Sequence, residues 1–228
     1  MIQNLFHNCA YSYSHGIDKK CLGIVPLYYS LAYTNKCKIC VVLGSGGGIV
    51  PMAFRMAQKD LNLIDAETWI VDGFLGDEYG NPLEPGGWAH KDSVMNTNFP
   101  EIKTIKDLTE NSGKYFDIID LLHIDAEHTY EAARQDFETF KNNLIETSII
   151  IFHDTQDSGV QKAVDEVVDT YNYDVLNLAD FASGLSILRK PTRNDYKKNL
   201  YDDCKTRPTG HKWTLGPDGG KKTWGSGH

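Results

Sequence analysis

The sequence of 228 residues contains no run of about 20 apolar residues, so it predicts no transmembrane helix. Its first residues lack the basic start and apolar stretch of a secretory signal, and we expect a cytoplasmic protein with no membrane partner. Cysteine is also scarce. Cys37 and Cys40 form the one Cys-x-x-Cys pair, and no second pair is present to complete a zinc site. Reduced structural thiols are therefore expected for all five cysteines, Cys204 included.

Basic residues are few over most of the chain. Residues 1–190 carry 15 Lys and Arg against 27 Asp and Glu, whereas residues 191–228 carry 8 against 4. An acidic body argues against a nucleic-acid-binding surface, so no nucleic-acid partner is expected. We divide the chain into an N-terminal helical segment (1–35), a main domain (36–190) and a basic, glycine-rich extension (191–228) that we interpret as solvated.

Apolar runs of strand length alternate with stretches of helical period, which is typical of βαβ units and a mostly parallel sheet. Strands are predicted at 38–43, 68–71, 102–105, 117–124, 148–152, 174–180 and 184–189. The three-residue link before the last strand favours an antiparallel hairpin. Helices are predicted at 21–33, from Pro51 onward, at 129–144 and along the stripe from Val160 to Tyr171.

A glycine turn, Gly44-Ser45-Gly46-Gly47-Gly48, follows the first strand of the main domain. Glycines let the backbone approach a nucleotide cofactor, and the free N–H groups of a following helix favour polar or anionic atoms. The fingerprint for NAD requires glycine at the sixth position, which here is Ile49. Asp72 ends the second strand, where an acidic side chain can accept hydrogen bonds from a ribose diol. A nucleotide cofactor without a pyrophosphate is therefore favoured over NAD.

Two clusters of acidic residues and histidines follow neighbouring buried strands. The first contains Asp125, Glu127 and His128, and the second contains His153 and Asp154. Open α/β sheets bind ligands at the carboxyl ends of their strands, so we expect these side chains to share one pocket. Carboxylates and imidazoles there can hold a divalent metal or act as a general base. The alternative is that they are structural, with Thr129 simply starting the next helix.

The motifs VVLGSGGGIVP, WIVDG, LLHIDAEHTYEAARQDFETF and SIIIFHDT resemble those of the class I methyltransferases that depend on S-adenosylmethionine (SAM). Within that class the chain is similar to the branch related to macrocin O-methyltransferase and cephalosporin hydroxylase-like proteins. The resemblance covers residues 36–190. It implies an α/β, Rossmann-like, doubly wound sheet of seven strands in the order 3-2-1-4-5-7-6, with the last strand antiparallel and helices on both faces.

This resemblance also implies SAM as the cofactor and a role for each motif residue. The methionine end would be cradled by Gly44, Ser45, Gly46, Gly47 and Gly48, and the ribose would be held by Asp72. In metal-dependent relatives magnesium is bound at positions that correspond to Asp125, His153 and Asp154, and the base lies at Glu127 or His128.

The chain departs from the family pattern at two positions. Val42 stands where the family often has an acidic residue, so we expect Asp125 to contact the methionine amino group instead. His153 replaces an oxygen ligand, and magnesium prefers oxygen. The metal is then absent, weakly bound or a softer ion such as manganese or iron.

The expected reaction is O-methylation of a small molecule. Cyclisation, elimination or aminopropyl transfer from the same sulfonium stays open, as does a non-catalytic module that kept the fold. The sequence does not identify the acceptor. The loop 73–93, with Tyr79 and Trp88, and the aromatic N-terminal residues are interpreted as pocket walls or as ordinary packing. Those N-terminal aromatic residues would also suit a homo-oligomer interface.

Overall fold

The computed structural model describes residues 2–73 and 82–191, and the chain up to Pro191 forms one compact unit. The predictions for Tyr79, Cys204 and the basic extension from residue 192 onward fall outside the described residues. Within the described ranges, no helix is long and apolar enough to cross a membrane. The cytoplasmic location and the three domain boundaries stay predictions.

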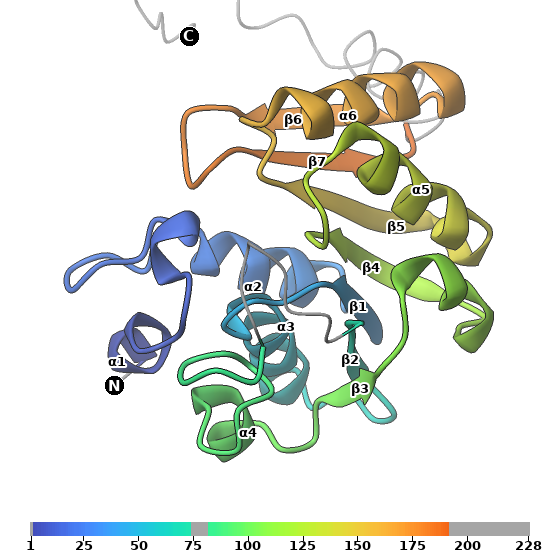
Figure 1. Ribbon diagram of the computed structural model, residues 1–228. Coiled ribbons are helices and arrows are strands. Elements are labelled where there is room, and N and C mark those ends of the chain that lie inside the picture. The colour runs from blue at the N-terminus through green and yellow to red at the C-terminus, as the bar shows by residue number, and fades with distance from the viewer. Residues whose placement is uncertain (1, 74–81, 192–228) are drawn as a thin grey trace, which may run out of the picture. The chain divides into compact units, whose positions relative to one another are not determined.

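A seven-stranded sheet forms the centre of the fold, in the order β3-β2-β1-β4-β5-β7-β6 (Figure 1). Six strands run in one direction, and only β7 is reversed, pairing antiparallel with both β5 and β6. The strand order and the antiparallel last strand implied by the resemblance are confirmed. The strands are β1 (Ile39–Leu43), β2 (Glu67–Val71), β3 (Lys103–Ile105), β4 (Ile119–Ile124), β5 (Leu144–His153), β6 (Asp174–Leu178) and β7 (Leu185–Arg189).

Helices cover both faces of the sheet (Figure 1). On one face α2 (Val25–Thr34) and α3 (Ile49–Asp60) pack against Cys40 and Val42 of β1. On the other face α5 (Tyr130–Phe140) and α6 (Ser158–Tyr171) pack in a core that contains Val41 and Leu43. Successive strand residues point to opposite faces, so a strand covered on both sides is apolar throughout. Burial in the first core explains why Val42 is apolar.

Two predicted helices have wrong boundaries. The helix predicted from residue 21 begins at Val25, because Gly23 has a φ of 56° and a Cβ there would lie 2.0 Å from the His15 carbonyl oxygen. The helix predicted to reach Leu144 ends at Phe140. A 3-10 turn follows, η4 (Lys141–Asn143), and Leu144 begins β5 because it pairs with Ile119 of β4.

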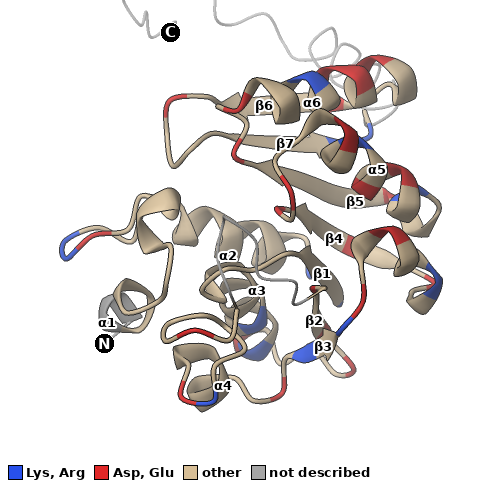
Figure 2. Ribbon diagram, viewed as in Figure 1, with Lys and Arg blue, Asp and Glu red and all other residues tan. Residues whose placement is uncertain are grey.

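The N-terminal segment is part of the core. It consists of α1 (Ile2–His7), the 3-10 helix η1 (Ser12–His15) and α2. Phe6, Ile17 and Tyr28 are buried in the same core as Phe54 of α3. The remaining short helices are α4 (Val94–Asn98), η2 (Thr109–Asn111) and η3 (Gly113–Tyr115). Figure 2 shows the acidic character of the body in the Asp and Glu residues along α5 and α6.

Candidate active site

The carboxyl ends of β1, β2, β4 and β5 meet at one edge of the sheet, where a pocket of about 550 Å³ opens. That volume is typical of a small-molecule site. Among the residues predicted from the sequence, the pocket is lined by Gly44, Ser45, Gly46, Asp72, Asp125, Glu127, His128 and Asp154. The structure therefore brings the glycine turn, Asp72 and both clusters together.

The glycine turn is shaped by close backbone contacts. Gly44 has a φ of 67°, and a Cβ there would lie 2.4 Å from the Asp125 carbonyl oxygen. At Gly47 a Cβ would lie 2.1 Å from the Ala10 carbonyl oxygen, and at Gly48 it would lie 3.1 Å from Met95. Gly47 and Gly48 are absent from the pocket lining formed by the described residues. These two glycines therefore let other segments pack behind the turn, while Gly44 and Gly46 face the pocket.

Asp72 lies directly after β2, and Trp88 holds its carboxylate. Trp88 Nε1 donates a hydrogen bond to Asp72 Oδ2 at 3.1 Å, and the Trp88 backbone N–H donates to the Gly46 carbonyl oxygen at 3.0 Å. Trp88 is 3% exposed and does not line the pocket. One buried residue thus links the glycine turn to the predicted ribose-binding residue.

Asp125, His128, His153 and Asp154 form a compact cluster of carboxylates and imidazoles. His153 Nδ1 lies 3.2 Å from Asp125 Oδ1 and 3.1 Å from Asp154 Oδ2. His128 Nε2 contacts the same two oxygens at 3.5 Å and 3.1 Å. Asp154 has a φ of 54°, a left-handed conformation that aspartate tolerates better than most residues. Two histidines therefore share two carboxylates.

These contacts shift the pKa values of the cluster. Burial would lower the pKa of His153, but the charges of Asp125 and Asp154 and their hydrogen bonds outweigh it and raise the pKa to about 10. Burial would likewise raise the pKa of the Asp125 carboxyl, yet His153 and His128 hold it well below its usual range. The hydrogen bond to Asp125 raises the pKa of His128. The contacts within the cluster therefore favour the ionised carboxylate of Asp125 and the protonated imidazoles of His128 and His153.

The cluster also contains ligand atoms suited to a cation. One ligand atom each from Asp125, His128 and Asp154 lies within 4.8 Å of the others. His153 is 1% exposed and lies beneath them, and its Nε2 atom is buried without a partner among the described residues. The oxygen and nitrogen donors fit a divalent metal, and the histidine suits manganese or iron better than magnesium.

Glu127 and His128, the two predicted bases, lie differently in the pocket. Glu127 is exposed at the rim, where Thr129 Oγ1 donates to it at 3.4 Å. His128 is partly buried and contacts both carboxylates. Thr129 also caps α5, since its Oγ1 accepts a hydrogen bond from Ala132 N–H. The helix-start interpretation of Thr129 is thus confirmed without removing Glu127 and His128 from the pocket.

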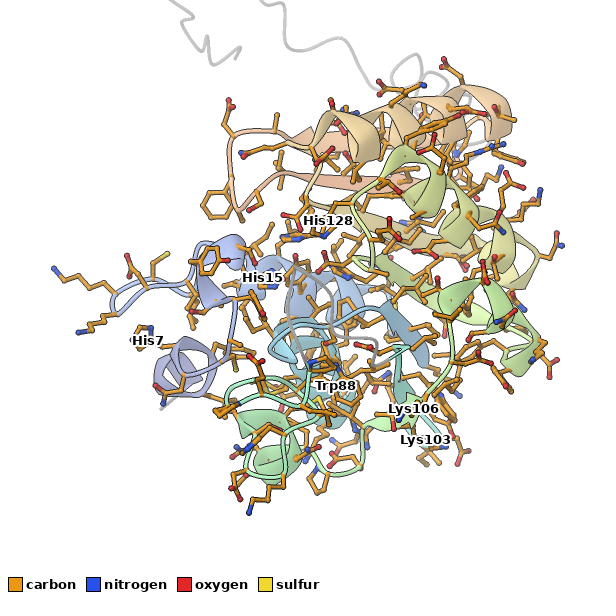
Figure 3. All side chains as sticks on the ribbon, in the orientation of Figure 1. His7, His15, Trp88, Lys103, Lys106 and His128 are labelled. Carbon is orange, nitrogen blue, oxygen red and sulfur yellow. The ribbon has the colours of Figure 1, made fainter. Side chains whose placement is uncertain are left out.

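Sequence reasoning missed a row of buried rings behind the cluster. The His15 ring packs on His153 with 4.6 Å between centroids, and Tyr28 Oη lies 3.3 Å from His15 Nδ1. The His123 ring lies 6.0 Å from His153 on the side of β4. Figure 3 shows His15, from the N-terminal segment, near His128, and both residues line the pocket. No motif marks His15, because it precedes the first strand and its contacts arise only on folding.

Residues 41–155 match the family model described as a methyltransferase domain, and the chain belongs to this family. The match includes the glycine turn, Asp72 and both clusters. Among curated proteins, the chain is 31% identical over 139 residues to an uncharacterised protein, y4gI, of Sinorhizobium fredii. That region is 58% of this chain but only 14% of the relative, so the chain spans a small part of the length of that protein.

Several solved methyltransferases have a similar fold. The Podospora anserina methyltransferase PaMTH1, bound to S-adenosylhomocysteine (SAH), has a TM-score of 0.59 and 15% identity, covering 82% of this chain and 87% of its own. A putative caffeoyl-CoA O-methyltransferase from Staphylococcus aureus has a TM-score of 0.56 and 15% identity, covering 73% and 82%. CalS11, a TDP-rhamnose 3'-O-methyltransferase of calicheamicin biosynthesis, has a TM-score of 0.52 and 15% identity, covering 72% and 76%.

These structural likenesses show the fold, and the family match shows the class. The chain therefore belongs to a family of methyltransferase domains and has the fold of class I methyltransferases.

Proposed function

We propose that the chain transfers the methyl group of SAM to a hydroxyl oxygen of a small molecule, with assistance from a divalent metal. The observation that carries this proposal is the carboxylate–histidine cluster, which lies in the same pocket as the glycine turn and Asp72. The compared O-methyltransferases named for caffeoyl-CoA and TDP-rhamnose support a small-molecule acceptor.

The cofactor would lie along the ends of β1, β2 and β4. Gly44, Ser45 and Gly46 line the pocket and would cradle the methionine end, while close contacts at Gly47 and Gly48 shape the turn. Asp72 would accept hydrogen bonds from the ribose hydroxyls, and it follows β2, which β1 and β4 separate from β5, the strand before Asp154. Asp125 would contact the methionine amino group, because Val42 is buried and apolar. When bound, SAM supplies a methyl group on a sulfonium sulfur.

The metal would be held by Asp125 and Asp154 together with a histidine. The resemblance assigns His153, and the geometry offers His128 as well, since its Nε2 contacts both carboxylates from the pocket side. His153 Nδ1 would have to exchange its hydrogen bonds with the carboxylates for a metal bond. A bound divalent cation would lower the pKa of the acceptor hydroxyl.

The proton of that hydroxyl has two acceptors in the pocket. Glu127 is exposed to solvent at the rim and can release a proton to water. His128 serves this role only where His153 is the metal ligand, because one imidazole nitrogen cannot bind a metal and take a proton together. The positioning of the hydroxyl in line with the sulfonium carbon would supply most of the rate enhancement.

The first test is calorimetric titration with SAM and SAH, in magnesium, in manganese and in chelator. Micromolar binding of both supports the cofactor site, and a chelator effect supports the metal. Absence of binding under every condition would remove the proposed function. Product analysis then decides the chemistry, because methyl transfer leaves SAH whereas aminopropyl transfer leaves methylthioadenosine. Full turnover in Asp125→Ala with unchanged SAM affinity would refute the metal-assisted mechanism.

A further inference from the structure

One wall of the pocket is built by the N-terminal segment, outside the region that the family match covers. The residues of this N-terminal wall that line the pocket are Tyr11, Tyr13, Ser14 and His15, whereas the family match begins at residue 41. The backbone N–H of the preceding Ala10 donates a hydrogen bond to the Gly86 carbonyl oxygen at 3.1 Å. The wall is therefore tied to the loop that contains Gly86 and has a fixed place beside the pocket.

Tyr11 is the residue of this wall that lies against the glycine turn. A Cβ added at Gly46 would lie 3.0 Å from Tyr11 Cδ2, and its nearest described neighbours outside the turn would all be atoms of the Tyr11 side chain. Gly47 lies against the Ala10 carbonyl oxygen in the same way, at 2.1 Å from an added Cβ. Tyr11 and Gly46 both line the pocket. The tyrosine ring therefore lies beside the surface on which the methionine end of SAM would bind.

The backbone of Tyr11 has a conformation that a bulky side chain disfavours. Its φ is 57°, in the left-handed region that glycine adopts without penalty. Ser14 N–H and Ser14 Oγ hold it there, since both donate to the Tyr11 carbonyl oxygen, at 3.1 Å and 2.8 Å. Strained backbone of this kind is concentrated at ligand-binding sites. A large ring at a position that favours glycine therefore points to a role for the ring itself.

Other left-handed residues give a measure of how exceptional Tyr11 is. Asn62, Asp65 and Asn172 are of the residue types that tolerate this conformation best. Lys36, with a φ of 52°, follows the end of α2 and does not line the pocket. Among the described residues that line the pocket, Tyr11 has the largest side chain in this conformation. Its strain and its contact with Gly46 are two separate observations that agree.

A ring at this position suits the charge of the methionine end. SAM carries positive charge there on its sulfonium and its amino group, and Val42, where the family often has an acidic residue, is buried and apolar. An aromatic ring attracts a cation that lies over its face, and the attraction grows as water is excluded. Tyr11 is half-buried. Its ring can therefore provide a favourable contact that Val42 cannot.

We propose that Tyr11 is a cofactor contact supplied by the N-terminal wall, and that its ring packs on the positively charged methionine end of SAM. This inference rests on the proposed placement of the cofactor over the glycine turn and adds a binding residue to it. Cofactor affinity then depends on a segment that lies outside the family match.

The test compares two ligands by calorimetric titration of the full chain. SAH has the methionine end, whereas methylthioadenosine has the same adenosine and sulfur without the amino-acid group. Tyr11→Ala should weaken SAH binding about tenfold and change methylthioadenosine binding by less than about twofold, because only SAH extends to the ring. Wild-type SAH affinity in this variant, or equal weakening of both ligands, would overturn the inference.

Two more variants separate the ring from the backbone. Tyr11→Phe keeps the ring and should bind SAH within about threefold of the wild type, whereas a loss as large as that of Tyr11→Ala would refute the ring contact. Tyr11→Gly removes the ring and relieves the left-handed backbone. It should melt about 2–4 °C above Tyr11→Ala yet bind SAH just as weakly. If SAH affinity instead followed the melting temperature of these variants, Tyr11 would be a structural residue and the inference would be wrong.

Lys36→Gly is the matched control for backbone relief. Lys36 is exposed, left-handed and away from the pocket lining, so this variant should keep the wild-type affinity for SAH. Failure of the wild type to bind SAH would remove the proposed function itself. Normal binding by the wild type together with unchanged binding by Tyr11→Ala would leave the proposed function intact and refute the Tyr11 contact alone.

Discussion

Replacement of Trp88 by Phe should weaken cofactor binding, although Trp88 does not line the pocket. The indole N–H donates to Asp72 Oδ2 at 3.1 Å, and Phe retains a similar ring while removing this donor. The backbone hydrogen bond from Trp88 to Gly46 is preserved in the variant. Asp72 would then lose one hydrogen bond that orients its carboxylate. We expect the affinity for SAH to fall about tenfold, or roughly 1.4 kcal/mol.

A double-mutant cycle isolates this effect. Asp72→Ala removes the carboxylate, so Trp88→Phe in that background should weaken SAH binding no further. The coupling free energy between the two positions should therefore equal about 1.4 kcal/mol. Calorimetric titration of SAH into the wild type, both single variants and the double variant measures it, and thermal unfolding checks that each variant is folded.

Trp69, on β2, provides a matched control. Its Nε1 donates to Glu67 Oε2 at 2.8 Å, and it does not line the pocket, so Trp69→Phe removes the same kind of bond away from the site. SAH affinity in this variant should match that of the wild type. Equal losses from Trp88→Phe with and without Asp72, or an SAH affinity within twofold of wild type, would refute the positioning role.

Two further predictions concern stability. Gly47→Ala places a Cβ against the Ala10 carbonyl oxygen and should lower the free energy of unfolding by about 2–4 kcal/mol. Urea unfolding measures this change, and an unchanged midpoint would show that the N-terminal segment moves freely. Burial raises the pKa of Asp136 to about 7, so the native state retains a proton that the unfolded chain releases above about pH 4, and stability should fall as the pH rises from 4 to 7. Asp136→Asn should therefore be more stable than the wild type at pH 8, by up to about 4 kcal/mol, and a less stable variant would contradict this.

Most of the fold could be predicted because the buried strands leave a clear apolar pattern. Every strand of the sheet was expected within a few residues, and the resemblance supplied the order in which they pair. The errors lie at helix ends. Leu144 continues the helical period of α5, yet its pairing with Ile119 places it in β5. Such long-range pairing outweighs local periodicity and is invisible in a single sequence.

The candidate site was predictable where its residues follow strands. Asp72, Asp125 and Asp154 each come directly after a strand, so the sheet alone brings them to one edge. The packing of His15 on His153 and the hydrogen bond from Trp88 to Asp72 could not be predicted, because each contact joins residues that are separated in the sequence. The glycine turn shows the same limit, since the close approach of Ala10 to Gly47 arises only on folding.

The N-terminal wall has a practical consequence for dividing this chain into parts. A shortened protein that begins at residue 17 would keep all seven strands, the glycine turn and both acidic clusters. It would lack the two tyrosines at the pocket and the ring that packs on His153. Boundaries taken from the matched region, residues 41–155, would also omit β6 and β7. The region that the family match covers is therefore shorter than the unit that completes the pocket.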